Sequence, residues 1–145
     1  MMKVVANLGH HHGPFDDVVT LSYEQRTKGR FKTITDSGEE LGVFLDRGKV
    51  LQEGDGLKTE DQKLVRVACL PEALTEARCE DWLTFARCCY HLGNRHVPLQ
   101  VGDRWVRFQP DHVLEDMVRL LGLSPTPIVA AFTPENGAYA GGHHH

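Results

Sequence analysis

Residues 81–122 read DWLTFARCCYHLGNRHVPLQVGDRWVRFQPDHVLEDMVRLLG, and the changes of period within them indicate the architecture. Apolar residues first recur at helical spacing, which predicts a helix from Asp81 to Leu92 that ends at a left-handed Gly93. Two short apolar segments, 97–101 and 105–108, then predict strands joined by a turn. The predicted apolar face of the helix consists of Trp82, Phe85, Ala86 and Cys89.

A second helix follows, beginning at Pro110 or Asp111 and ending at Gly122. Proline suits the first turn of a helix, and glycine suits its end. The buried stripe expected for this helix consists of Leu114, Met117, Val118 and Leu121. Residues 74–79 and 128–132 supply a strand before the first helix and one after the second. The order is then βαββαβ, which is the ferredoxin-like arrangement.

The first half of the chain has a different pattern. Segments 18–21, 31–34 and 41–45 predict short strands separated by glycine turns, and no helical period of useful length occurs. Such a pattern is typical of a small sheet or barrel. The expected fold class is therefore α+β, with a β-rich N-terminal domain before the ferredoxin-like one. The predicted organisation is 1–70, 71–138 after a hinge at Pro71, and a flexible Gly/His tail at 139–145.

Composition excludes several classes of protein. Sixteen Lys and Arg against twenty Asp and Glu give a net charge of −4, which argues against a nucleic-acid-binding surface. No apolar run approaches the roughly 20 residues of a membrane span, and Met1–Gly9 lack the apolar stretch of a secretory signal. Four cysteines lie outside any C-x-x-C spacing and suit buried positions in a reducing cytosol. We expect a cytoplasmic protein that binds neither nucleic acid nor membrane.

Histidine is the unusual component. Six of the nine histidines form the triplets His10–His12 and His143–His145. Neutral imidazole is a good ligand for nickel, copper and zinc, so such tracts suggest metal binding. The terminal triplet is either a metal-binding tail or the remnant of a purification tag. The early triplet is either a metal-collecting patch or an exposed loop, and the sequence leaves both alternatives open.

Three further histidines are isolated. His96 follows the first predicted helix in a polar segment where a ring nitrogen can face solvent, and His112 lies in the first turn of the second helix beside Asp111. His91 is helical and covers a packing edge or faces solvent. A single surface histidine is usually no ligand, so composition alone assigns none of them a role.

Catalytic patterns are weak. The chain has no G-x-S-x-G elbow, no H-E-x-x-H motif and no Gly-rich phosphate loop. A catalytic zinc needs about three protein ligands and a base. The local candidates are His96, Asp111 and His112, with Glu115 as the base.

Four segments match a known family in order along the chain. The most specific is YHLGNRHVPLQ at 90–100, and the others are 21–30, 111–117 and 134–139. Together they resemble the urease accessory protein UreE, a family of nickel metallochaperones. The matches cover nearly the whole chain, which ends in a Gly/His tail as members of that family do.

The resemblance implies a peptide-binding-like N-terminal domain and homodimerisation through the ferredoxin-like domain. It also implies that the histidine of the Gly-Asn-Arg-His-x-Pro motif, His96, shares Ni²⁺ with its two-fold mate. Nickel then passes to the accessory GTPase of the urease maturation complex and so to apo-urease. In vitro, Zn²⁺ or Cu²⁺ can substitute. The further ligands implied are His112, His143, His144 and His145.

Physical chemistry agrees with this assignment. One imidazole per chain holds nickel poorly, but two-fold symmetry brings two together, and a tail after Gly141-Gly142 can add more. Imidazoles, with an unperturbed pKa of about 6.5, exchange metal and respond to mild acid. Pro110 stands where some relatives carry a histidine, so His112 is an auxiliary or second-site ligand.

The sequence thus predicts a nickel chaperone and not an enzyme. Two hypotheses from other classes are a peptide-binding or folding-chaperone module with incidental histidines and, ranked last, a monomeric zinc hydrolase.

Overall fold

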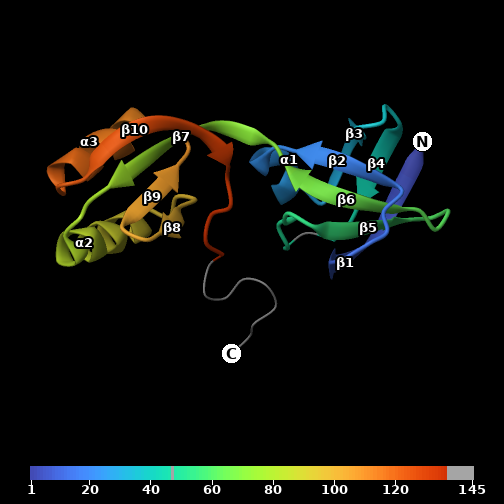
Figure 1. The fold of residues 1–145 in the computed structure, drawn as a ribbon, viewed down its shortest axis with the longest axis horizontal. Helices are drawn as coiled ribbons and strands as arrows, with labels where there is room; N and C mark the ends of the chain where they lie inside the picture. The colour runs from blue at the N-terminus through green and yellow to red at the C-terminus, as the bar shows by residue number, and fades with distance from the viewer. Residues whose placement is uncertain (47, 137–145) are drawn as a thin grey trace. The chain divides into compact units, whose positions relative to one another are not determined.

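The computed structural model describes residues 1–46 and 48–136. These residues form two compact units, Met1–Leu70 and Pro71–Asn136. Figure 1 shows both units, and each is described by itself.

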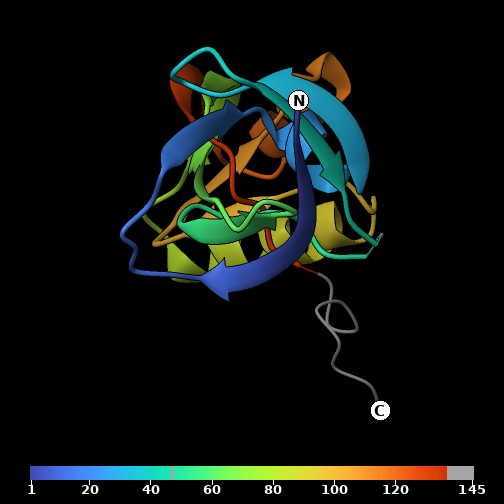
Figure 2. The same cartoon turned by 90° about the vertical axis from the view of Figure 1, so that its right-hand side faces the viewer.

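The first unit is a six-stranded sheet in the order β2-β6-β5-β1-β4-β3. Its pairs β1–β4 and β2–β6 are parallel, and the remaining pairs are antiparallel. The sheet curls until its two edges approach each other. At that point Asp36, just after β3, donates its backbone N–H to the Val18 carbonyl of β2 at 2.8 Å. The result is barrel-like (Figure 2). The strands are β1 (Met2–His10), β2 (Asp17–Leu21), β3 (Arg30–Ile34), β4 (Glu40–Phe44), β5 (Asp55–Thr59) and β6 (Leu64–Cys69).

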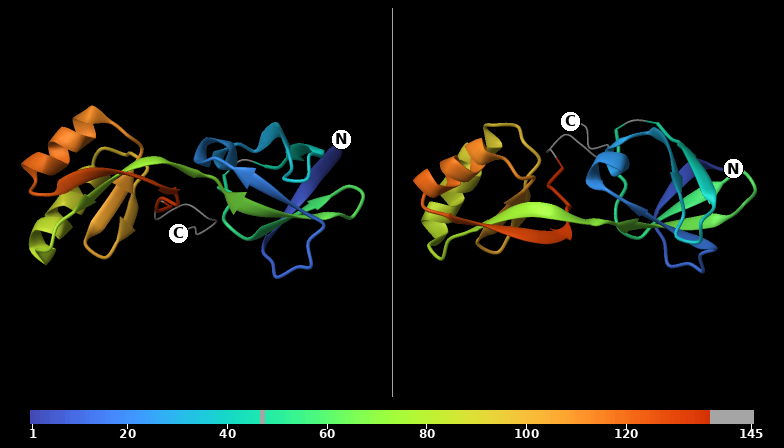
Figure 3. Two further views of the ribbon diagram at one scale, coloured as in Figure 1. Left: turned by 45° about the horizontal axis from the view of Figure 1, so that its top comes forward. Right: turned by 90° about the horizontal axis from the view of Figure 1, so that it is seen from above.

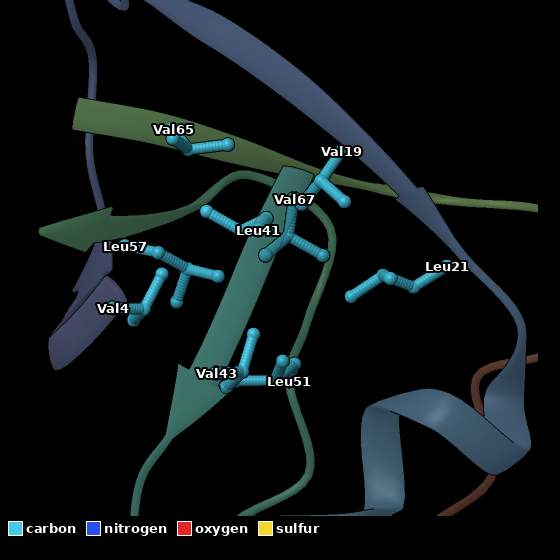
Figure 4. Close-up of a cluster of buried hydrophobic side chains, with 9 residues drawn as sticks. All are labelled: Val4, Val19, Leu21, Leu41, Val43, Leu51, Leu57, Val65 and Val67. Atoms are coloured by element: carbon cyan, nitrogen blue, oxygen red, sulfur yellow. The ribbon is translucent and has the colours of Figure 1, made fainter. Parts of the chain in front are cut away.

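Valine and leucine side chains fill the interior of this sheet. They alternate with outward residues along the strands, as period-two patterning requires. Figure 4 shows them converging from several strands. The cluster consists of Val4, Val19, Leu21, Leu41, Val43, Leu51, Leu57, Val65 and Val67, each at most 2% exposed.

Two elements of this unit lack the period that predicted the others. Strand β1 lies between β5 and β4, although only Val4 of its residues is fully buried. Helix α1 (Tyr23–Thr27) is a single turn, too short to produce the helical period that the sequence lacked in this half. A capping box starts it: the Ser22 hydroxyl accepts from the Gln25 N–H at 3.2 Å, and Gln25 Oε1 accepts from the Ser22 N–H at 2.9 Å.

The second unit confirms the ferredoxin-like prediction. Its sheet has the order β10-β7-β9-β8, and all neighbours are antiparallel. Both helices lie on the same face of this sheet (Figure 3). The elements are β7 (Pro71–Arg78), α2 (Trp82–Gly93), β8 (Gln100–Gly102), β9 (Trp105–Phe108), α3 (His112–Leu120) and β10 (Ser124–Ala131).

The buried face of α2 differs from the predicted one. Phe85 is buried and Cys89 packs against the same core, as predicted, but the other fully buried residues are Cys88 and Leu92. Trp82 is 59% exposed, and its ring lies 5.1 Å from the Arg104 guanidinium carbon. Contact with the underlying sheet determines which face of α2 is buried, and the helical period of the sequence carries no information about that contact. For α3 the predicted stripe is confirmed, since Leu114 and Val118 are buried while Met117 and Leu121 pack against the same core.

Two strands that differ in length from the prediction contain or follow proline. The strand predicted at 97–101 begins only at Gln100, because Pro98 has no N–H to donate to a ladder. Strand β10 is longer than predicted and contains Pro125 and Pro127. Proline is tolerated there because β10 is an edge strand that pairs only with β7.

Candidate metal centre

The topology brings the segments that carry His96 and His112 to one end of the second sheet. Gln100, at the start of β8, pairs with Arg107 near the end of β9. The segment that leads from α2 into β8 and the segment that leads from β9 into α3 therefore leave the sheet at the same end. These two segments carry His96 and His112, respectively.

The last described residues return to that same end. Thr133 donates its backbone N–H to Gln100 Oε1 at 3.1 Å, and Glu135 donates to the Leu99 carbonyl at 2.8 Å. Residues 133–135 therefore lie beside the segment that carries His96. His143, His144 and His145, predicted as ligands, lie outside the described residues.

His96 occupies a left-handed turn after α2. The helix runs through Gly93 to a right-handed Asn94 cap, so the prediction of a left-handed stop at Gly93 was wrong. The left-handed residue is His96, with φ of 53°, and its N–H reaches the Gly93 carbonyl at 3.3 Å. This conformation costs a non-glycine residue about 1–2 kcal/mol. The turn that follows the helix therefore presents the imidazole of His96 to solvent.

His112 is the first residue of α3, and its side chain is exposed. The helix is capped by Asp111, whose Oδ1 accepts from the Val113 N–H at 2.8 Å and the Leu114 N–H at 3.1 Å. An acidic cap stabilises the positive end of the helix. The fold thus fixes the backbone of His112 and leaves its ring accessible.

The carboxylates that a zinc hydrolase would require here already have partners. Asp111 caps α3, and Glu115 Oε2 accepts from the Thr75 hydroxyl at 2.7 Å, with Thr75 itself only 3% exposed. In residues 1–46 and 48–136, no group of three or more His, Cys, Asp or Glu side chains is placed to hold a metal. The ligand role of His96 and His112 stays a prediction.

Burial shifts the pKa of three of the four cysteines. Burial, with lesser contributions from neighbouring Cys89 and Cys79, raises the pKa of Cys88 to about 11. Burial also raises the pKa of Cys89 and of Cys69. Metals bind the thiolate form, so high pKa values disfavour these groups as ligands at neutral pH.

Fold and site together define a two-unit α+β protein in which a ferredoxin-like unit carries exposed histidines at one end. Comparison with known families agrees. The model of the N-terminal domain of the UreE urease accessory protein matches residues 2–70, and that of the C-terminal domain matches residues 72–145.

Curated relatives match along the whole chain. The urease accessory protein UreE of Marinomonas sp. (strain MWYL1) is 51% identical over 146 residues, which cover 100% of this chain and 99% of the relative. Those of Alteromonas mediterranea and Psychromonas ingrahamii are 49% and 47% identical, and each match spans the full chain and at least 95% of the relative. The chain belongs to the UreE family of urease accessory proteins.

Membership makes the protein a urease maturation chaperone and not an enzyme, one that acts with the urease maturation machinery. Across the described part of the chain, no helix has both the length and the apolar character needed to cross a membrane.

Proposed function

We propose that the protein carries Ni²⁺ and delivers it, through the accessory GTPase, to apo-urease. The metal binds where the C-terminal units of two copies meet, between His96 of one protomer and the same residue of its partner. The observation that carries the proposal is the exposed imidazole of His96, held in a left-handed turn.

Symmetry supplies what one chain lacks. The described part of a single chain has no cluster of three or more metal-ligating side chains, and one imidazole holds nickel weakly. A two-fold axis beside His96 doubles the ligand count without any further change of sequence. Because the turn fixes the backbone of His96, the two rings meet with little additional loss of conformational freedom.

The tail histidines supplement this pair. The Glu135 N–H donates a hydrogen bond to the carbonyl of Leu99, which lies three residues after His96. From Asn136 to His143 an extended chain spans up to about 25 Å. That reach allows His143, His144 or His145 to complete the coordination, while His112 serves as an auxiliary ligand at the same end of the sheet.

A site made of neutral imidazoles suits a carrier. Such ligands compete with protons in the range where histidine titrates, and they exchange more readily than a closed thiolate cage. The raised pKa values of the cysteines are consistent with a site that uses no thiolate.

Native mass spectrometry with increasing Ni²⁺ tests the proposal on the full chain and two variants. His96→Ala removes the shared ligand. His91→Ala is the matched control, because His91 is also exposed, lies on α2 and flanks the same turn. We expect a dimer with one tightly held nickel, lost in His96→Ala and kept in His91→Ala. Tight binding that survives His96→Ala, or a monomer that binds one ion per chain, would refute the shared site.

A further inference from the structure

We propose that His10 and His12 form a separate metal site in the first unit, which takes one divalent ion of the class that prefers imidazole, such as Cu²⁺ or Ni²⁺. The two residues lie at and just beyond the end of β1 (Figure 1). This inference does not depend on His96 or on dimerisation.

The two rings have the separation that a shared ion requires. Their centroids are 5.0 Å apart, and their planes are 86° to one another. With metal–nitrogen bonds of about 2.0–2.1 Å, two imidazoles on one ion have centroids about 4.5–5.2 Å apart at bond angles of about 90–110°. Both side chains are exposed, so an ion can reach both rings from solvent.

The intervening residue faces elsewhere. Residues two apart in an extended segment project to the same side, and the residue between them projects to the other. His11 Nδ1 accepts the Gly13 N–H at 3.0 Å, and its ring lies 5.8 Å from that of Phe15. The triplet therefore divides into an outward pair and a single histidine whose ring is turned toward Gly13 and Phe15.

The backbone beneath the pair is anchored. His10 pairs with Asp55 of β5, and the His11 N–H donates to the Gly54 carbonyl at 3.1 Å. Gly54 has φ of +86°, and a Cβ there would lie 2.8 Å from His10 Nδ1. The glycine thus leaves room for the His10 ring, and strand pairing limits the entropy lost on binding.

The carboxylates of the paired segment 53–55 are already engaged. Asp55 Oδ2 accepts from Asn7 Nδ2 at 3.2 Å and from the Gln52 N–H at 2.9 Å. Glu53 accepts from Arg66 and from the Cys69 N–H. The site therefore offers two imidazoles, with water in the remaining positions. Such a site binds weakly and exchangeably, and it prefers Cu²⁺ to Ni²⁺.

The experiment uses the full chain with every other proposed ligand replaced by alanine. This background lacks His96, His112, His143, His144 and His145. Into it we introduce His10→Ala, His12→Ala or, as the matched control, His11→Ala. Calorimetric titration with Cu²⁺ and then Ni²⁺ measures affinity, and Cu²⁺-induced broadening of the histidine ring NMR signals in the same background chain identifies the rings beside the ion.

We expect one ion per background chain. Affinity falls at least about tenfold in His10→Ala and in His12→Ala, since even outer-shell changes cost about 10–100-fold, and it is unchanged in His11→Ala. Broadening should be strong at the rings of His10 and His12. The inference is wrong if the background binds no ion, if both variants retain the affinity, or if His11→Ala is equally damaging. The interface site is tested separately by His96→Ala, so either proposal can fail alone.

Discussion

Replacing Asp111 with alanine tests whether this carboxylate caps α3 or serves as a metal ligand. The substitution removes an oxygen that accepts from the N–H groups of Val113 and Leu114. It also removes a negative charge from the positive end of the helix. Loss of an N-cap together with its favourable interaction with the helix dipole costs about 1.5 kcal/mol. In a unit of this size that lowers the melting temperature by about 6–12 °C.

Both tryptophans of the chain, Trp82 and Trp105, lie in the second unit, so their fluorescence follows the unfolding of that unit in urea without added metal. Asp111→Asn retains the acceptor, and we expect a loss of only a few tenths of a kcal/mol. Asp116→Ala is the matched control on the same helix. It breaks only an exposed ion pair with Arg119, worth about 0–1 kcal/mol. Equal stability of Asp111→Ala and Asp116→Ala would refute the capping role, and a loss seen only with metal present would favour Asp111 as a ligand.

Two further predictions concern groups with shifted pKa values. Burial alone would raise the pKa of Glu53, but the Cys69 N–H and the Arg66 ion pair outweigh it and hold the pKa below its ordinary 4.5. The charge of Glu53 therefore stabilises the fold above about pH 4.5, and this stabilisation is lost as pH falls through the lowered pKa. Glu53→Gln should be less stable than wild type at pH 7, and the difference in stability should shrink in acid. Urea unfolding followed by the NMR signals of β6 amides measures this, with the exposed Glu24→Gln as control, and a pH-independent difference would contradict it. Burial raises the pKa of Cys88 to about 11, so Cys88 should react with a thiol reagent at pH 7 only after unfolding. Cys79 and Cys89 are half-buried and should be labelled earlier than Cys88. Mass mapping of the labelled sites checks this order, and early labelling of Cys88 would contradict it.

Local signals in the sequence were sufficient for the plan of the second unit. The helical period, the turn at Gly102-Asp103 and the left-handed Gly122 depend on neighbours a few residues away, and they gave the βαββαβ order found here. The motif around His96 gave the family, which the comparisons confirm. The capping box Ser22–Gln25 was a local signal as well, and it marks the short helix that periodicity missed.

Other features depend on residues far apart in the chain. Which face of α2 is buried follows from the sheet beneath it. The place of β1 between β4 and β5 follows from pairing with residues 41–43 and 55–59. The return of the chain's last described segment to Leu99 and Gln100 rests on two long-range hydrogen bonds. Sequence periodicity records what each residue prefers locally, whereas strand pairing and burial fix which distant residues become neighbours, and that is what brings the histidine-bearing segments to one end of the sheet.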